Sequence, residues 1–465
     1  MKKILVGFSV MLLALSGLAG CAGSGGGNKE SSSVPEEELT GTALAVSKAS
    51  KMTMAELEAE SQREFEENKG DPFKVVGLTS VLQKVMSTFA KKYSWVHYKE
   101  EGEGAVADNV NVKNDYKDYT LLTALNVADK SYFADYALVQ DVRSFSAYLE
   151  EGILHNYVPS DWKELGLKEE DTYPLKGIHF NKLFWTNTNF ETVTGKTLYN
   201  IWQVAGKAGD HKDHLDKISF QTPVTEQINM SLLVSCYAED NQARIEKAYK
   251  DYYGKDWVAT SEYPSAGQQW VDEFLTNITT WHASDGTAMK QTQLETDWKA
   301  GVVYYGAFAK MKDAAGKYYA VEGQESDPIL KDLIETEGDN AGKIQAMKTV
   351  KWDWEINGFN GFMYCMDSQI VNNAKYPYTA CLYARVLLEE SSYTDAIFNK
   401  ATPAADGSKG NQYGYYYPGT ASENFKYAAG DWTKEQHIAN EINEDYEFLK
   451  DVKSAWTQAI IAKIS

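Results

Sequence analysis

Short apolar runs of strand length alternate with helical segments over residues 54–158, and this order constrains the fold more than any other feature. Strands are expected at Phe73–Leu78, Ser94–Glu100 and Ala134–Asp141, and Ile153–Val158 is expected to rejoin the sheet. Helices are expected over residues 54–68, 80–89, 116–127 and 144–150, the first of them opened by a Thr53–Glu56 capping box. Such alternation favours an α/β fold with a mainly parallel, doubly wound sheet.

The alternation becomes looser beyond residue 180. Apolar runs predict a crossing strand at Phe184–Thr186 and further strands at Lys217–Gln221 and Gly301–Phe308, and Gly358–Ile370 is apolar again. Helices are expected over residues 225–237, 240–252, 266–281, 378–389 and 445–463. No internal repeat is found, so the chain is not a solenoid.

The first residues of the sequence predict the cellular location of the protein. Lys2 and Lys3 precede the apolar run Ile4–Ala19, which is shorter than the roughly 20 residues that span a bilayer. The run ends in Leu-Ala-Gly-Cys21, which closely resembles the lipobox of bacterial lipoproteins. The resemblance implies that Cys21 becomes the mature amino terminus and carries lipid. The alternative is an ordinary secretory signal with an incidental cysteine.

Charge and cysteine content exclude several classes of partner. The chain has 465 residues, with 46 Lys and Arg against 66 Asp and Glu, so its formal net charge is −20. This balance argues against nucleic acid as a partner and against attraction to anionic lipid. Four cysteines are too few and too scattered for a disulfide framework or a zinc site, although a Cys365–Cys381 bridge stays open.

Four sequence blocks, in order along the chain, resemble the extracellular solute-binding proteins of ABC importers, especially the ferric-iron and spermidine/putrescine class. The blocks are Lys74–Ser80; Asp135–Asp141 with Glu151–Pro159; Asn200–Trp202 with Lys217–Pro223; and Asn373–Ala380. The resemblance implies a two-lobed, type II periplasmic-binding-protein-like fold. In that fold each lobe is a mostly parallel sheet flanked by helices, and crossing hinge strands join the lobes. Extra sequence at 285–350 and 400–440, and Tyr376 where the family often has His, depart from the pattern.

The implied organisation divides the chain into five parts. They are a signal peptide (1–20), a flexible Gly/Ser/acidic tether (21–50), the first part of lobe 1 (51–180), lobe 2 (181–350), and a return to lobe 1 with carboxyl-terminal helices (351–465). The resemblance implies a non-catalytic monomer without a cofactor, lipid-anchored outside the cytoplasm. It would capture a small molecule or ion in an interlobe cleft and deliver it to a permease and its ATPase.

The candidate ligand-binding residues follow strand ends and the crossing segments. They are Thr79, Ser80, Asp141, Trp185, Glu226, Tyr305 and Asn357. The turns at 79–80 and 141–142 each precede a helix, whose free N–H groups can bind anions or simply be capped. Asp141, Trp185 and Glu226 would suit a polyamine. The Tyr304–Tyr305 pair would suit ferric iron, but its place in an apolar strand also fits sheet packing. Sugars stay open as well.

Other chemistries find less support in the sequence. Gly195-Lys196-Thr197 resembles a P-loop ending, but Phe190 stands where that motif needs glycine. His211 and His214 lack a third metal ligand. The runner-up is a surface carbohydrate-active lipoprotein, either a glycoside hydrolase or a glycan-binding protein, because 66 acidic residues leave room for a carboxylate pair.

Overall fold

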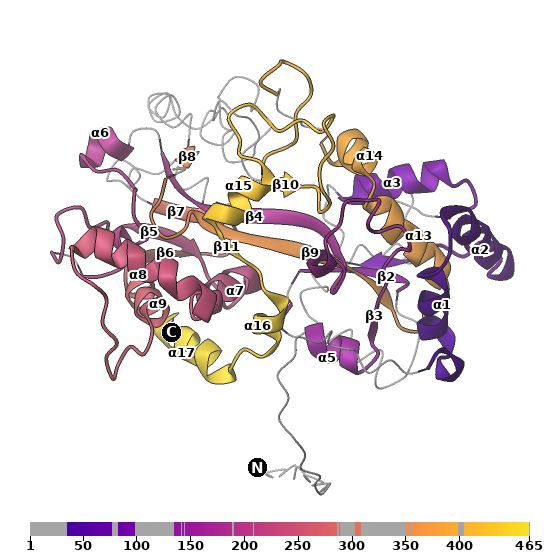
Figure 1. The fold of residues 1–465 in the computed structure, drawn as a ribbon, viewed down its shortest axis with the longest axis horizontal. Helices are drawn as coiled ribbons and strands as arrows, with labels where there is room; N and C mark the ends of the chain where they lie inside the picture. Colours follow the sequence, from indigo (N-terminus) through magenta and orange to yellow (C-terminus); the bar gives the residue numbers. More distant parts are fainter. Residues whose placement is uncertain are drawn as a thin grey trace, which may run out of the picture. The chain divides into compact units, whose positions relative to one another are not determined.

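Two long strands run through the centre of the molecule (Figure 1). They are β4 (Lys176–Asn187) and β9 (Gly361–Val371), which pair antiparallel with His179 opposite Cys365. Every residue of β9 is buried, as expected for a nearly continuous apolar strand that is covered on both faces. These are the crossing strands that join the two ends of the sheet.

The computed structural model describes twelve parts of the chain: residues 35–76, 82–97, 134–140, 142–143, 145–187, 190–207, 209–285, 288, 303–307, 350–352, 355–398 and 404–464. Residues 40–465 form one compact unit, although length alone suggests two to three domains. Glu36–Glu38, which precedes this unit, is a short 3₁₀ turn. None of the described helices is both long and apolar enough to cross a bilayer.

One group of elements packs at the carboxyl end of β9, and we call it the β2 half. Its members are β1 (Val75–Val76), β2 (Tyr136–Val139), β3 (Leu154–Asn156), α1 (Gly41–Ala49), α2 (Met54–Glu67), α3 (Leu82–Lys92), α5 (Phe145–Glu150), α13 (Pro377–Leu387), α14 (Glu390–Ser392) and the π-helical turn Tyr393–Ile397. β1 lies parallel to β2, whereas β2 and β3 both run antiparallel to β9.

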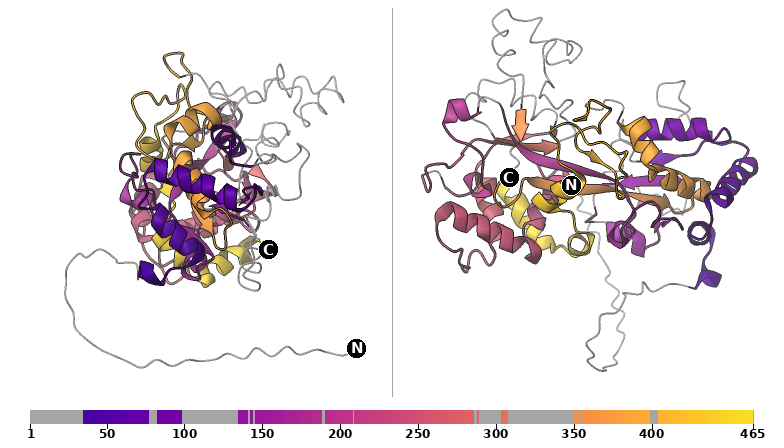
Figure 2. Two further views of the ribbon diagram at one scale, coloured as in Figure 1. Left: turned by 90° about the vertical axis from the view of Figure 1, so that its right-hand side faces the viewer. Right: turned by 45° about the horizontal axis from the view of Figure 1, so that its top comes forward.

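A second group packs at the other end of the crossing strands, and we call it the β5 half. Its members are β5 (Ile218–Gln221), β6 (Ile278–His282), β7 (Val303–Ala307), α6 (Phe190–Thr194), α7 (Gln227–Ser235), α8 (Glu239–Tyr253) and α9 (Ala266–Thr276). β5 is parallel to both β6 and β7, and β7 is antiparallel to β4. Figures 1 and 2 show these helices at the opposite end from α1, α2 and α3.

The remaining elements complete the sheet and close the chain. They are η4 (Glu169–Asp171), η5 (Ile201–Gln203), β8 (Val350–Trp352), β10 (Tyr415–Tyr416), α15 (Lys434–Asn440), β11 (Ile442–Asn443), α16 (Tyr446–Lys450) and α17 (Ser454–Ile464). The sheet order is β1-β2-β9-β4-β7-β5-β6, with β8 and β10 on β4 and β3 and β11 on β9. The predicted α/β fold with crossing strands is confirmed, but the sheet is mixed, because the pairs β2–β9, β9–β4 and β4–β7 are antiparallel.

Several predictions of individual elements are wrong. The tether was expected to reach residue 50, but Gly41–Ala49 is helix α1 and buries Val46 and Ala49. Residues 94–97 form no strand, because Val96 packs in the core directly after α3. The helix expected over 266–281 ends at Thr276, and β6 follows it. The expected helix over 116–127 lies outside the described residues.

The carboxyl-terminal region packs against both halves, and not against the β2 half alone. α13 returns to the β2 half, where Glu64 accepts 2.8 Å hydrogen bonds from the Tyr378 and Thr379 amides at its start. α17 instead packs against the β5 half: the ring centroids of Trp456 and Tyr237 are 5.3 Å apart. α13 therefore packs in the β2 half, whereas α17 packs against the β5 half.

Candidate functional site

A buried lysine lies in the middle of crossing strand β4. Lys182 is 1% exposed, and its Nζ lies 3.0 Å from Asp285 Oδ2 and 3.9 Å from Glu226 Oε1. The same Nζ donates a 2.9 Å hydrogen bond to Asn229 Oδ1. We call these four residues the Lys182 cluster. A buried ammonium needs such partners, because desolvation without them is very unfavourable.

The surroundings of the Lys182 cluster are aromatic. Strand alternation places Phe180 and Phe184 on the same face of β4 as Lys182. Phe180 stacks on Tyr364 with centroids 5.6 Å apart, and Phe184 lies 5.1 Å from the ring of Tyr305. The cluster is thus a polar group inside an aromatic wall, a composition typical of small-molecule sites.

Two polar atoms near the Lys182 cluster have unused hydrogen-bonding capacity. Within the described residues, neither the Tyr305 hydroxyl nor Gln221 Oε1 has a hydrogen-bond partner. Burial, together with the negative charge of Asp285, raises the pKa of Tyr305 well above its usual range, so the phenol stays protonated. Native proteins leave few buried polar atoms unpaired, so these two mark the surroundings of the Lys182 cluster as unusual.

The structure brings together only part of the predicted ligand-binding set. Glu226 belongs to the Lys182 cluster, and Tyr305 borders it. Trp185 is fully buried further along β4, where its indole N–H donates a 3.1 Å hydrogen bond to the Gly306 carbonyl. This hydrogen bond joins β4 to β7, so Trp185 contributes to packing within the sheet.

The other predicted residues lie elsewhere or cannot be placed. Asn357 is exposed, and its backbone bonds to Tyr199 and Ile201 in the β5 half. Thr79, Ser80, Asp141 and the lipidation candidate Cys21 lie outside the described residues.

A contact between the two halves lies beside these positions. Arg143, shortly after the end of β2, donates a hydrogen bond from Nη2 to Oε1 of Gln227, the first residue of α7. The end of β2 therefore lies next to the start of α7. Gln227, the first residue of α7, directly follows Glu226 of the Lys182 cluster. A ligand bound between the halves would lie at this junction, beyond the carboxyl ends of strands.

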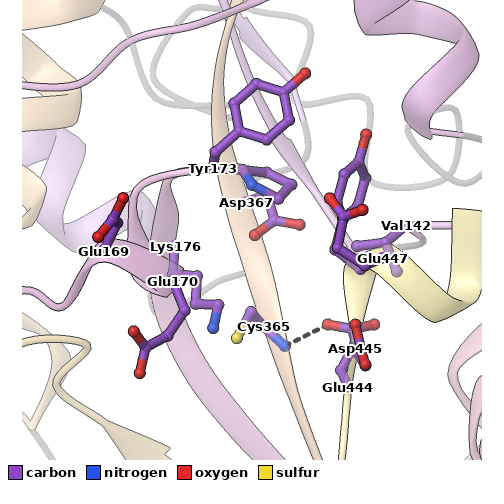
Figure 3. A pocket seen from close by; sticks show the side chains of 12 residues that line it. Val142, Glu169, Glu170, Tyr173, Lys176, Cys365, Asp367, Glu444, Asp445 and Glu447 are labelled. Atoms are coloured by element: carbon purple, nitrogen blue, oxygen red, sulfur yellow. Dashed lines mark hydrogen bonds between the residues drawn. The ribbon is translucent and has the colours of Figure 1, made fainter. Parts of the chain in front are cut away.

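A cavity of about 610 Å³ opens at the edge of β9 (Figure 3). η4 and the start of β4 line one side, and Val142 lines the other together with the segment from Glu444 to Glu447. Cys365 and Asp367 of β9 also line the cavity. It lies where the edge of β9 has no strand partner, between β2, which ends opposite Asp367, and β11, which ends opposite Met363.

The cavity is built around this unpaired stretch of strand edge. The Cys365 amide donates a 2.9 Å hydrogen bond to Glu444 Oε2, so a carboxylate replaces the missing strand (Figure 3). Burial raises the pKa of Asp367 to about 7, although the attraction of Lys176 opposes the rise. Burial also raises the pKa of the Cys365 thiol well above its usual range, which disfavours a nucleophilic thiolate.

Cysteine and metal chemistry are not organised in the described part of the chain. Cys236, Cys365 and Cys381 are buried and free, so the Cys365–Cys381 bridge left open by the sequence is not formed. Across the described residues, no three or more His, Cys, Asp and Glu side chains are grouped to hold a metal ion.

The sequence did not point to Lys182, Asn229, Asp285 or Arg143. Lys182 is a charged residue in a largely aromatic and aliphatic stretch, Phe-Asn-Lys-Leu-Phe-Trp, and this interruption was the available signal. Asp367 likewise interrupts the apolar run of β9. A charged residue within a strand expected to be central is worth weighing as a site residue.

Comparison with known proteins finds similarity in structure alone. No family model matches the chain, and no curated protein matches it. A ferric binding protein from Campylobacter jejuni is similar at a TM-score of 0.49 and 10% identity, over 84% of this chain and 99% of that one. An ABC transporter substrate-binding protein from Bradyrhizobium japonicum USDA 110 gives 0.49 and 10%, over 85% and 99%. The PBP MotA from A. tumefaciens B6, in complex with glucopine, gives 0.47 and 11%, over 84% and 99%.

These proteins belong to the class that the four sequence blocks resemble. Identities of 10–11% are too low to carry a ligand or a residue role over to this chain.

Proposed function

We propose that this chain is an extracytoplasmic solute-binding lipoprotein that captures a small solute between its two halves and delivers it to an ABC importer. The observation that carries the proposal is the junction over the crossing strands, where Arg143 meets Gln227 beside the Lys182 cluster. Two strands that link two groups of elements form a natural hinge, and a solute that contacts both groups favours the closed form.

Two features of the sequence support the same proposal. The run ending in Cys21 has the lipobox pattern, and the four family blocks follow it in order. A tether beginning at Cys21 and ending before α1 would hold the body near the membrane. Lobe 1 would comprise residues 51–180 and the returning segment from 351, and lobe 2 residues 181–350, with β4 and β9 crossing between them.

A thermal-shift screen of the full chain tests the capture of a solute. The panel contains iron salts, amines, sugars, amino acids and a soluble glycan. One class should raise the melting temperature by a few degrees, since a ligand that binds only the native state stabilises it by mass action. No rise with any class would contradict the proposal, and hydrolysis of the glycan would favour an enzyme instead.

Membrane anchoring is tested by substitution at the lipobox. Cys21→Ala should move the protein from the membrane fraction to the soluble fraction, because it removes the acceptor thiol. Ser24→Ala, three residues further on, is the matched control and should stay with the membrane. Retention of the Cys21→Ala protein at the membrane would contradict lipid anchoring.

A further inference from the structure

The Lys182 cluster places an amine directly against a carboxamide. Lys182 Nζ lies 2.9 Å from Asn229 Oδ1, and a carbonyl bond is about 1.2 Å long, so Cγ of Asn229 lies within about 4 Å of the amine nitrogen. Two atoms held about 3 to 3.5 Å apart are close to the geometry of attack. Lys182 and Asn229 are 1% and 0% exposed, so bulk water is excluded from the pair. The pair is therefore positioned for a reaction as well as for a hydrogen bond.

The nitrogen of the same carboxamide is held away from the lysine. Asn229 Nδ2 donates a 2.8 Å hydrogen bond to the backbone carbonyl of Gln221, the last residue of β5. This bond fixes the orientation of the amide, with its oxygen toward Lys182 and its nitrogen toward β5. Lys182 Nζ and Asn229 Nδ2 therefore lie on different sides of the carboxamide, as an incoming and a leaving nitrogen would.

A carboxylate is in place to take the proton that the amine must lose. An ammonium group is not nucleophilic, and Asp285 Oδ2 lies 3.0 Å from Lys182 Nζ, which allows direct proton transfer. The aromatic surroundings of the cluster favour this transfer, because it converts two buried charges into two neutral groups. Glu226 Oε1 is 3.9 Å from Nζ, beyond hydrogen-bond distance, so the geometry gives this step to Asp285.

We propose that Lys182 and Asn229 become joined by an amide bond between their side chains, formed by the protein itself. After proton transfer to Asp285, the electron pair of the neutral amine attacks Cγ of Asn229. The new bond between Nζ and Cγ forms, and the bond between Cγ and Nδ2 breaks. Of the three protons of the lysine ammonium group, one stays on the new amide and two leave with the departing NH₂ group as an ammonium ion. Asp285 carries these two protons in turn and ends as a carboxylate, so no oxidant or reductant is needed.

The bond would fasten a crossing strand to the β5 half. Lys182 belongs to β4 and Asn229 to α7, and the two residues are 47 positions apart along the chain. Covalent closure of such a loop removes conformations from the unfolded chain, as a disulfide does. The cysteines in the described part of the chain are free, so no disulfide supplies this constraint there. Such a brace goes beyond solute capture and does not depend on it.

Peptide mapping of the full chain tests the proposal directly. Trypsin cleaves after a free lysine, so an unreacted chain releases Gly177–Lys182 and Ile218–Arg244 as separate peptides. An amide at Lys182 blocks that cleavage and joins Gly177–Lys196 to Ile218–Arg244, at a mass one ammonia below the sum of the two peptides. We expect mass spectrometry of the denatured digest to find the joined species and little free Gly177–Lys182. Release of Gly177–Lys182 in full yield, without the joined species, would overturn the proposal.

Variants assign the roles of the three groups. Lys182→Arg keeps a cation among the carboxylates but removes the nucleophile, since a guanidinium stays protonated, and it should abolish the joined species. Asn229→Ala removes the carboxamide and should abolish it as well. Asp285→Asn keeps both reacting groups and should lower the yield of the joined species at least about tenfold, because positioned proton transfer accelerates such steps by about 10² to 10⁴.

Asp272→Asn is the matched control. Asp272 also pairs with a lysine against the β5 half, at 2.7 Å from Lys463 Nζ, and its substitution should leave the yield of the joined species unchanged. Survival of the joined species in Lys182→Arg or Asn229→Ala would overturn the assignment of the bond. An unchanged yield in Asp285→Asn would overturn the role of that carboxylate. The peptide map of the unsubstituted chain decides whether the bond exists even if a variant fails to fold.

Discussion

Two buried aspartates flank strand β2, and their surroundings differ completely. Asp135 precedes the strand and is fully buried; it accepts backbone hydrogen bonds of 2.8 to 3.1 Å from Lys74, Lys375 and Tyr376. Asp367 lies opposite Val139 at the other end of the strand, and its Oδ2 has no donor among the described residues. One carboxylate is saturated by its own chain, and the other is not.

The difference in hydrogen-bond donors distinguishes a carboxylate that stabilises the fold, Asp135, from a carboxylate that could bind a ligand, Asp367. Asp135 ties the start of β2 to β1 and to the turn before α13, so its partners are the fold itself. Asp367 faces a cavity and is left with an unfilled acceptor. Burial of a carboxylate is therefore weak evidence of function, and the number of donors that reach it is the more informative quantity.

The largest expected effect is at the saturated acid. Asp135→Asn should lower the free energy of unfolding by about 5 kcal/mol, because three hydrogen bonds to a charged acceptor are weakened and one oxygen becomes an N–H donor. Urea denaturation followed by circular dichroism measures the change. Asp367→Asn is the matched control at the other end of β2, and an equal loss in both variants would remove the distinction between the two acids.

Substitution in the Lys182 cluster should lower the stability of the protein nearly as much as Asp135→Asn does. Lys182→Met should lower the free energy of unfolding by about 4 kcal/mol, since it leaves Asp285 and Glu226 buried without their cation. The same denaturation experiment measures it, with the exposed Lys255→Met as control. A neutral Lys182→Met would mean that Lys182 does not form its ion pairs with Asp285 and Glu226.

A third buried group, His437, is paired with two carboxylates, and this pairing should be visible in the pH dependence of stability. Burial lowers the pKa of His437, but attraction to Glu441 and Asp431 outweighs burial and raises it to about 9. Because the folded pKa is raised, this stabilisation is complete below about pH 6.5 and is lost as pH rises through 9. The loss should amount to about 3 kcal/mol, and His437→Gln should remove this alkaline step from a plot of stability against pH. An unchanged step in the variant would contradict the assignment.

The smallest loss of stability is expected at the unsaturated acid. Burial raises the pKa of Asp367 to about 7, so its contribution to stability falls as pH rises from about 4 to 7 and stays lost above that. Asp367→Asn should therefore change stability at pH 5 by less than about 1 kcal/mol and should not reduce it at pH 8. Thermal unfolding at the two pH values measures this. A large loss at pH 8 would show that Asp367 has a structural partner.

Most of the fold could be predicted from local patterns, and the errors have local causes. β2, β5 and β7 and helices α7 and α8 lie within the predicted ranges or close to them, because apolar periodicity and turn residues are properties of a short stretch. β6 was missed because Ile278 continues the apolar spacing of α9, so the helix seemed to run on. The mixed pairing of the sheet could not be read locally, since it depends on which distant strand lies alongside β9.

The site was harder to predict because its residues meet only in the folded chain. Glu226 and Tyr305 were expected from their segments, but Lys182 becomes a buried cation only because Asn229 and Asp285 lie next to it. Asp367 is one of 66 acidic residues, and nothing in its sequence neighbours reveals that its carboxylate lacks a donor. Burial and pairing are tertiary properties, so the sequence suggested segments but not the site.

Hinge closure is tested most directly by the distance between the two halves. Spin labels on Glu66→Cys in α2 and Lys255→Cys after α8 report it in the full chain by double electron–electron resonance, since both positions are exposed and Cys236, Cys365 and Cys381 are buried. The measurement compares the free protein with the protein saturated by the solute that raises its melting temperature most. Closure of the two halves on the solute should give a shorter and narrower distance distribution in the saturated protein. An identical distribution with the solute bound would contradict capture by closure of two hinged halves.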